Sequence, residues 1–312
     1  MIWKRKDLLG IEDITQEEIE HILAEAQKTP EPVLVGKSVA LLFFEPSTRT
    51  HTSFDLAAKR LGATVTGVPI AQSSVQKGES FLDTLKTLEA MGVNLFVVRH
   101  GESGILHPVA PQLQASVINA GDGAHEHPTQ ALLDFYTILQ HKGKFKGLKV
   151  VIVGDILHSR VARSNVWGLL RLGAQVTLCG PATLVPKEAS EWGVEVSYNL
   201  EKALQGADVI NVLRLQLERQ KESLIPSLAE YAKLYGLDAQ NLSLAKPDCL
   251  VLHPGPMNRG VEISSEVADG SQSAILEQVK NGVAIRMAVL RLLLSSRSKN
   301  EESRGRLKKA KA

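Results

Sequence analysis

Residues 38–62 read SVALLFFEPSTRTHTSFDLAAKRLG, and this stretch decides the fold class. Apolar residues fill positions 39–44, a run typical of a buried strand. A proline and four polar residues follow, and positions 48–61 then show the spacing of an amphipathic helix. A strand that runs directly into a helix is the repeating unit of α/β proteins.

The same alternation continues along the chain. Short runs rich in β-branched residues predict strands at 38–44, 63–68, 93–98, 115–119, 149–154, 174–179, 194–198, 208–213 and 249–252. Helical periodicity predicts helices at 16–28, 48–61, 80–91, 128–141, 160–172, 200–205 and 272–296. Thr15 and Glu18 are spaced as a capping box for the first helix. The fold class predicted is α/β, with two doubly wound parallel-sheet domains.

A domain boundary is expected at HKGKFKGLKVV (141–151), where a polar, glycine-bearing link precedes a fresh strand. The final predicted helix has no strand after it, so we expect it to pack back on the first domain. The expected domains are 1–141, completed by the helix at 272–296, then 142–271, and a disordered basic tail at 297–312.

Composition indicates a globular protein: 44% of the residues are hydrophobic and 22% are charged. No apolar run has the length of a membrane span and no signal-peptide core is present, so we expect a cytoplasmic protein without membrane contact. Cys179 and Cys249 lie in strand-like apolar runs, which predicts buried free thiols.

The net charge of +2 comes from the C-terminal end. Residues 297–312 hold seven of the 36 basic and two of the 34 acidic residues, which leaves 29 basic and 32 acidic residues elsewhere. The tail could contact nucleic acid or an acidic partner, but a solvated disordered end is the interpretation we favour. We therefore predict no nucleic-acid partner.

Ser47, Thr48, Arg49 and Thr50 begin the helix that follows the first strand. The first turn of a helix presents unpaired amides and a partial positive charge, and here hydroxyls and a guanidinium are added to it. The pattern favours a phosphate site. An ordinary N-cap is the alternative, because Ser and Thr are preferred caps in any case.

Polar side chains also follow other predicted strands. They are Arg99, His127, Gln130, Arg160, Arg214 and the residues of HPGPMNRG (253–260). Each alone has an ordinary interpretation, a surface arginine or a structural histidine. Because ligands of open α/β sheets bind outside the carboxyl ends of the strands, we expect these clusters to converge on one cleft between the domains. Several arginines there would suit a ligand set with several negative charges.

Several kinds of chemistry have no motif in this sequence. VGDILHSR lacks the glycine spacing of a dinucleotide fingerprint, and neither a Walker lysine motif nor a nucleophile elbow is found. The sequence shows no closely spaced metal-ligating set and no obvious carboxylate pair. We therefore expect no cofactor and no metal, and a site that works by positioning and charge stabilisation.

FEPSTRT, HPTQ, the arginine of GDILHSR and HPGPMNRG together resemble the aspartate/ornithine carbamoyltransferase family over residues 1–296. SSVQKGES, RLQLERQ and HPGP resemble the members that use L-aspartate in pyrimidine biosynthesis. The Cys-Leu-Pro and Ser-Met-Gly motifs of ornithine-specific members are not present.

The resemblance implies a binding set for carbamoyl phosphate: Ser47, Thr48, Arg49, Thr50, Arg99, His127, Gln130, Pro254, Gly255 and Pro256. Of these, Thr50, Arg99 and His127 would be catalytic, because they would hold the carbamoyl oxygen as it becomes an oxyanion. The backbone of Pro254 and Gly255 would hold the carbamoyl amide, and the family implies a cis bond before Pro256.

The resemblance also implies a binding set for L-aspartate: Lys77, Arg160, Arg214 and Gln216. Ser73 and Lys77 would reach the site from an adjacent subunit, so a homotrimer with shared active sites is expected, possibly within a higher assembly. Gln76 stands where some relatives have a second lysine. Two alternatives remain open, a carbamoyltransferase for another amine acceptor and a non-catalytic anion-binding scaffold.

Overall fold

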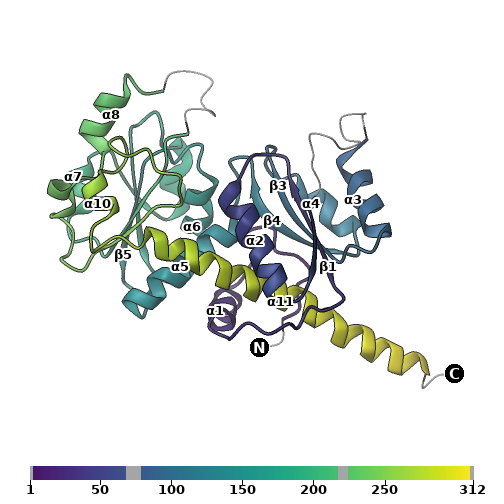
Figure 1. The fold of residues 1–312 in the computed structure, drawn as a ribbon. Coiled ribbons are helices and arrows are strands. Elements are labelled where there is room, and N and C mark those ends of the chain that lie inside the picture. Colours follow the sequence, from purple (N-terminus) through teal and green to yellow (C-terminus); the bar gives the residue numbers. More distant parts are fainter. Residues whose placement is uncertain (1–2, 68–78, 217–223, 310–312) are drawn as a thin grey trace. The chain divides into compact units, whose positions relative to one another are not determined.

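The computed structural model describes residues 3–67, 79–216 and 224–309, with residues 295–309 described by their backbone alone. The chain divides into two compact units (Figure 1). Unit 1 consists of Met1–Leu132 and Gly282–Ala312, and unit 2 of Leu133–Asn281. The chain passes from one unit to the other within two helices, α5 (Pro128–Lys142) and α11 (Ile275–Lys309).

Unit 1 contains a four-stranded parallel sheet with the order β2-β1-β3-β4. Its strands are β1 (Ser38–Phe43), β2 (Thr64–Gly67), β3 (Leu95–His100) and β4 (Ser116–Asp122). The unit also holds α1 (Gln16–Glu25), α2 (Thr48–Arg60), α3 (Phe81–Ala90), α4 (Leu106–Val109) and a 3-10 turn at Ala110–Gln112. The chain runs from β1 outward to β2 and then to β3 on the other side, so the switch point lies between β1 and β3.

The core of unit 1 forms on both faces of this sheet. The central residues of β1 and β3 are buried throughout, as expected for parallel strands covered by helices. Phe54 of α2 is fully buried, and the guanidinium of Arg286 on α11 lies 5.0 Å from the centre of its ring. This contact agrees with the assignment of the part of α11 from Gly282 onward to unit 1.

Unit 2 contains a five-stranded parallel sheet with the order β7-β6-β5-β8-β9. Its strands are β5 (Lys149–Val153), β6 (Gln175–Cys179), β7 (Glu195–Ser197), β8 (Val209–Val212) and β9 (Leu250–Leu252). Its helices are α6 (Arg160–Arg171), the 3-10 helix Lys187–Trp192, α7 (Leu200–Leu204), α8 (Leu228–Tyr235), α9 (Ala239–Leu242) and α10 (Ser265–Ala268). The chain runs from β5 outward to β6 and β7, and then crosses to β8 on the other side of β5. The switch point of unit 2 therefore lies between β5 and β8.

Cys179 and Cys249 lie in the core of unit 2 and form no disulfide. Burial raises the pKa of both thiols to about 12, so both stay protonated and unreactive near neutral pH. The prediction of buried free thiols is confirmed.

All nine predicted strands are present within three residues of their expected ends, and both sheets are parallel. The capping box is confirmed, because Thr15 accepts from the Glu18 amide and Glu18 accepts from the Thr15 amide. The disordered tail expected at 297–312 is corrected in part, since the backbone of α11 stays helical to Lys309. This segment is rich in Glu, Lys and Arg, which favour helix, so the helix does not stop where its apolar spacing ends.

Candidate active site

The start of α2 supplies most of the predicted phosphate-binding donors of unit 1. Ser47 is the N-cap residue, but its side chain makes no capping hydrogen bond, and the first turn contains no acidic residue. Thr48 and Arg49 are exposed, whereas Thr50 is buried. A helix start with an uncommitted hydroxyl and no internal negative charge suits an anion better than it suits an ordinary cap.

Arg99 lies next to this turn because β3 pairs directly with β1. The register places Arg99 opposite Phe43, and the Phe44 amide donates to the Arg99 carbonyl over 2.8 Å. The Arg99 side chain is largely buried, and its Nε lies 3.4 Å from a carboxylate oxygen of Glu45. The sheet therefore brings a second guanidinium, after that of Arg49, to the switch point between β1 and β3.

His127 and Gln130 are both buried at the start of α5, where the Gln130 amide donates to the His127 carbonyl. The loop that precedes them is fixed by Glu126, which is fully buried. One Glu126 carboxylate oxygen accepts from the amides of Ile11 and Glu12, each over 3.0 Å. This loop is thus held by the N-terminal segment of the same unit.

In unit 2, the residues predicted to bind aspartate follow β5 and β8, the two strands at the switch point. Arg160 is the first residue of α6 and is buried, and Ser159 caps that helix by accepting from the Ala162 amide. Gln216 donates through Nε2 to the His158 carbonyl over 3.2 Å, which places Gln216 beside the start of α6.

A glycine allows the two loops of unit 2 to approach. Gly154, at the end of β5, has a φ of 130°, and a Cβ atom there would lie 3.0 Å from the Leu213 carbonyl oxygen. Arg214, which follows Leu213, is half-buried. The structure therefore groups Arg160, Arg214 and Gln216 beyond the carboxyl ends of β5 and β8 in unit 2.

The predicted amide-binding loop follows β9. The bond between Gly255 and Pro256 is cis, as the family resemblance implied, and Gly255 has a φ of 65°. Pro254 and Gly255 are half-buried, and Pro256 is exposed. Three predicted residues, Ser73, Gln76 and Lys77, lie outside the described residues.

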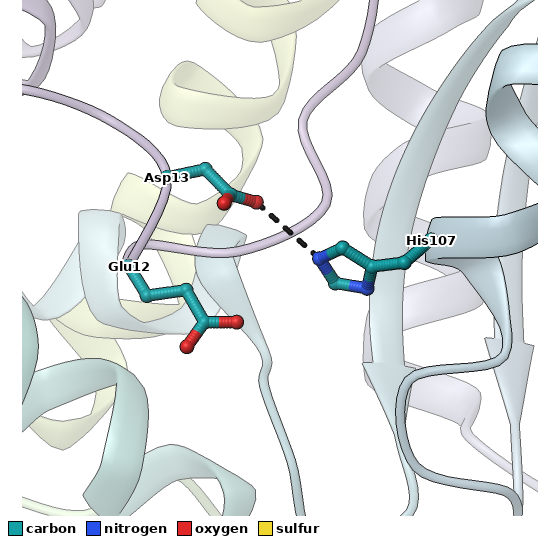
Figure 2. A group of neighbouring side chains, drawn as sticks. All are labelled: Glu12, Asp13 and His107. Carbon is teal, nitrogen blue, oxygen red and sulfur yellow. Dashed lines mark hydrogen bonds and ion pairs between the residues drawn. The ribbon is translucent and has the colours of Figure 1, made fainter.

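The sequence reasoning missed a group of ionisable side chains in unit 1. Glu12, Asp13 and His107 bring one possible ligand atom each to within 4.8 Å of one another, and Figure 2 shows Asp13 pointing at His107 with Glu12 beside them. Asp13 pairs with His107 over 3.4 Å, and Glu12 with His125 over 2.9 Å. Both carboxylates are exposed, so these ion pairs account for the arrangement without a cation.

His125 also pairs with Asp122, which is fully buried at the end of β4. Its hydrogen bond to Asp122 raises the pKa of His125 to about 9 against the opposing effect of burial. Burial would raise the pKa of Asp122, but hydrogen bonds from His125 and Asn119 outweigh it and lower that pKa. No local motif indicates this cluster, because 94 residues separate Asp13 from His107.

Comparison with known families assigns both halves of the chain to one class of transferase. Residues 6–140 match the carbamoyl-P binding domain of aspartate/ornithine carbamoyltransferases, and residues 146–293 match their Asp/Orn binding domain. The chain belongs to the aspartate/ornithine carbamoyltransferase family.

Within this family, highly similar curated relatives are aspartate carbamoyltransferase catalytic subunits. The chain is 59% identical to that of Moorella thermoacetica over 300 residues, which cover 93% of this chain and 98% of the relative. It is 55% identical to that of Halothermothrix orenii over 311 residues, which cover 97% and 99% of the two chains.

Solved structures of both branches of the family share the fold. Ornithine carbamoyltransferase from Pyrococcus furiosus matches with a TM-score of 0.84 at 30% identity, covering 95% of this chain and 99% of that one. Aspartate transcarbamoylase from Trypanosoma cruzi, in complex with carbamoyl aspartate and phosphate, matches with a TM-score of 0.84 at 31% identity, covering 94% and 97%. The fold alone therefore does not distinguish the two acceptors.

Proposed function

We propose that the chain transfers the carbamoyl group of carbamoyl phosphate to the amine of L-aspartate, giving N-carbamoyl-L-aspartate and phosphate. The observation that carries this proposal is the identity of 55–59% to aspartate carbamoyltransferase catalytic subunits over nearly the full length of both chains. Structural similarity is equal for an ornithine and an aspartate enzyme, so the sequence identity decides the acceptor.

Carbamoyl phosphate would be bound mainly by unit 1. The amides, hydroxyls and guanidinium of residues 47–50 would hold its phosphate, with Arg99 alongside. Thr50, Arg99 and His127 would donate to the carbamoyl oxygen. Gln130 would hold the carbamoyl amide together with the 254–256 turn of unit 2.

The reaction needs a positioned acceptor and support for developing charge. The neutral amine of aspartate attacks the carbamoyl carbon, and the carbonyl oxygen becomes an oxyanion that Thr50, Arg99 and His127 stabilise. Removing one such donor commonly costs about 10²–10³ in rate. The C–O bond to phosphate then breaks, and the departing phosphate takes up the amine proton, so no protein base is required.

Aspartate would be bound by the guanidiniums of Arg160 and Arg214, which suit its two carboxylates, with the amide of Gln216 nearby. Lys77 and Ser73 of a neighbouring subunit would complete this side, which makes the active form a homotrimer. The carbamoyl-phosphate domain proposed is 1–141 with the helix at 272–296, and the aspartate domain is 142–271.

The product would serve pyrimidine biosynthesis in the cytoplasm. None of the helices in the described part of the chain combines the length and hydropathy that a membrane span requires.

Turnover with paired acceptors tests the proposal. The purified protein is incubated with carbamoyl phosphate and either L-aspartate or L-ornithine, and released phosphate and carbamoylated product are measured. We expect product from aspartate alone. Transfer to ornithine but not aspartate would identify another acceptor, and no transfer to any amine would favour the scaffold.

A further inference from the structure

The loop after β9 encloses a buried pair of ionisable side chains, His253 and Glu262. Both side chains are fully buried, and Nε2 of His253 lies 3.3 Å from Oε1 of Glu262. Burying a carboxylate is costly unless it is well bonded, and Oε2 of Glu262 accepts no hydrogen bond from the described residues. Packing of the core alone therefore does not explain why these two side chains are buried together.

The backbone of the loop determines which nitrogen of His253 carries the proton. The Gly255 amide donates to Nδ1 of His253 over 2.8 Å. A nitrogen that accepts from an amide has no hydrogen of its own, so the proton of neutral His253 lies on Nε2. Nε2 faces Glu262 and can donate to it.

Glu262 closes the loop from its other end. The same Oε1 atom accepts the amide of Asn258. Two amides of the loop, those of Gly255 and Asn258, are thus joined through His253 and Glu262. The carbonyl groups of Pro254 and Gly255 lie within the segment that these bonds close.

A second buried carboxylate anchors the start of the loop. The His253 amide donates to Oε1 of Gln278 over 2.9 Å, and Nε2 of Gln278 donates to Asp134 over 2.7 Å. Asn165 of α6 also donates to Asp134, over 2.9 Å. The loop is therefore tied to the helix that begins at Arg160, and all of these residues belong to unit 2.

We propose that Glu262 and His253 are positioning residues, which orient the Pro254 and Gly255 carbonyls toward the carbamoyl amide through the Nδ1–Gly255 and Oε1–Asn258 hydrogen bonds. This inference rests on the proposed function. Neither residue touches the substrate. Their effect is geometric, because a misplacement of about 1 Å can cost roughly a hundredfold in rate.

The main test compares Glu262→Ala with Glu262→Gln. The amide oxygen of glutamine can still accept from His253 and Asn258, whereas alanine removes both bonds. We expect Glu262→Ala to lower kcat about a hundredfold, and Glu262→Gln to restore kcat to within about fivefold of wild type. Affinity for inorganic phosphate, measured by calorimetry, should be unchanged in both variants because the proposed phosphate donors lie in unit 1.

Asp208→Ala is the matched control. Asp208 is also a buried carboxylate of unit 2 that accepts a backbone amide, that of Lys149, and pairs with a side chain, that of Lys246. Asp208 directly precedes β8 and so lies at the amino ends of the parallel strands, whereas the loop with His253 and Glu262 follows the carboxyl end of β9. We expect this variant to lose thermal stability as Glu262→Ala does while keeping its kcat.

If Glu262→Ala does not fold, His253→Asn provides the same test. Its amide oxygen can accept the Gly255 N–H, but the link to Glu262 is lost, so a drop in kcat of at least about tenfold in the folded variant supports the proposal. A folded Glu262→Ala or His253→Asn variant with wild-type kcat would overturn it, and so would an equal loss in Asp208→Ala. Failure of the wild-type protein to carbamoylate aspartate would instead overturn the proposed function.

Discussion

Each sheet begins with the same strand–turn–helix pattern, and the two helix starts differ in one hydrogen bond. Both have a serine at the N-cap and an arginine in the first turn, Ser47 and Arg49 in α2, Ser159 and Arg160 in α6. Ser159 accepts from the Ala162 amide, whereas Ser47 makes no capping bond. Arg160 is buried and Arg49 is exposed.

The difference shows how one local pattern can serve two kinds of anion. At α2, the hydroxyl and the first-turn amides remain available, so backbone and side chain together can surround a phosphate. At α6, the Ser159 hydroxyl already caps the helix, so the group that faces an anion differs: it is the Arg160 guanidinium, whose planar fork suits a carboxylate. We therefore expect substitutions at these two helix starts to cause different kinetic defects.

The largest effect is expected from Arg49→Ala. Loss of a charged phosphate donor should lower kcat/KM for carbamoyl phosphate about 10³-fold. Arg60→Ala is the control, since Arg60 is an exposed arginine in the last turn of the same helix, and should change activity less than about twofold. Steady-state kinetics at saturating aspartate measure both. An Arg49→Ala enzyme as active as Arg60→Ala would contradict the α2 phosphate site.

A more selective defect is expected from Arg160→Ala. The KM for aspartate should rise about 10²-fold, because one carboxylate loses its charged partner, while the KM for carbamoyl phosphate should change little. Arg163→Ala controls for the loss of an arginine from α6. The Arg163 guanidinium lies 5.1 Å from the centre of the Trp192 ring, and its variant should keep the wild-type KM values. A rise in the carbamoyl phosphate KM alone would reverse the assignment of the two helix starts.

A mixing experiment extends the comparison to the proposed trimer. Arg49→Ala and Lys77→Ala homotrimers should both be nearly inactive. After co-refolding, about three-quarters of random trimers are mixed, and each regains one intact site from Arg49 of one chain and Lys77 of the next. Activity should return to about a quarter of wild type. Subunit exchange without recovered activity would show that the sites are not shared.

The smallest effects separate the two serines. Ser159→Ala should lower the free energy of unfolding by about 1 kcal/mol through loss of a cap. Ser47→Ala should change it by less than about 0.5 kcal/mol, yet weaken phosphate binding about fivefold. Urea denaturation and phosphate calorimetry on both variants test this contrast. Equal destabilisation by the two substitutions would mean that Ser47 is an ordinary cap.

Much of the fold could be predicted because the positions of its strands and long helices depend on local sequence patterns. Runs of apolar β-branched residues located all nine strands, and the 3.6-residue period located the long helices of both units. Four of the described α-helices were missed. Three of them, α4, α9 and α10, have four residues each, too few for a period to show, and the fourth, α8, has eight. The end of α11 was predicted too early because apolar spacing stops before helix propensity does.

The sequence by itself determined the α/β class, the strand positions, the capping box at Thr15 and the polar residues at the strand ends, because each depends on neighbours in the chain. Only the tertiary structure decided the strand order, the missing cap bond of Ser47, the His253–Glu262 pair inside its loop and the meeting of Asp13 with His107. These features depend on which distant segments pack together and on which hydrogen bonds that packing leaves available, and local periodicity carries no information about either.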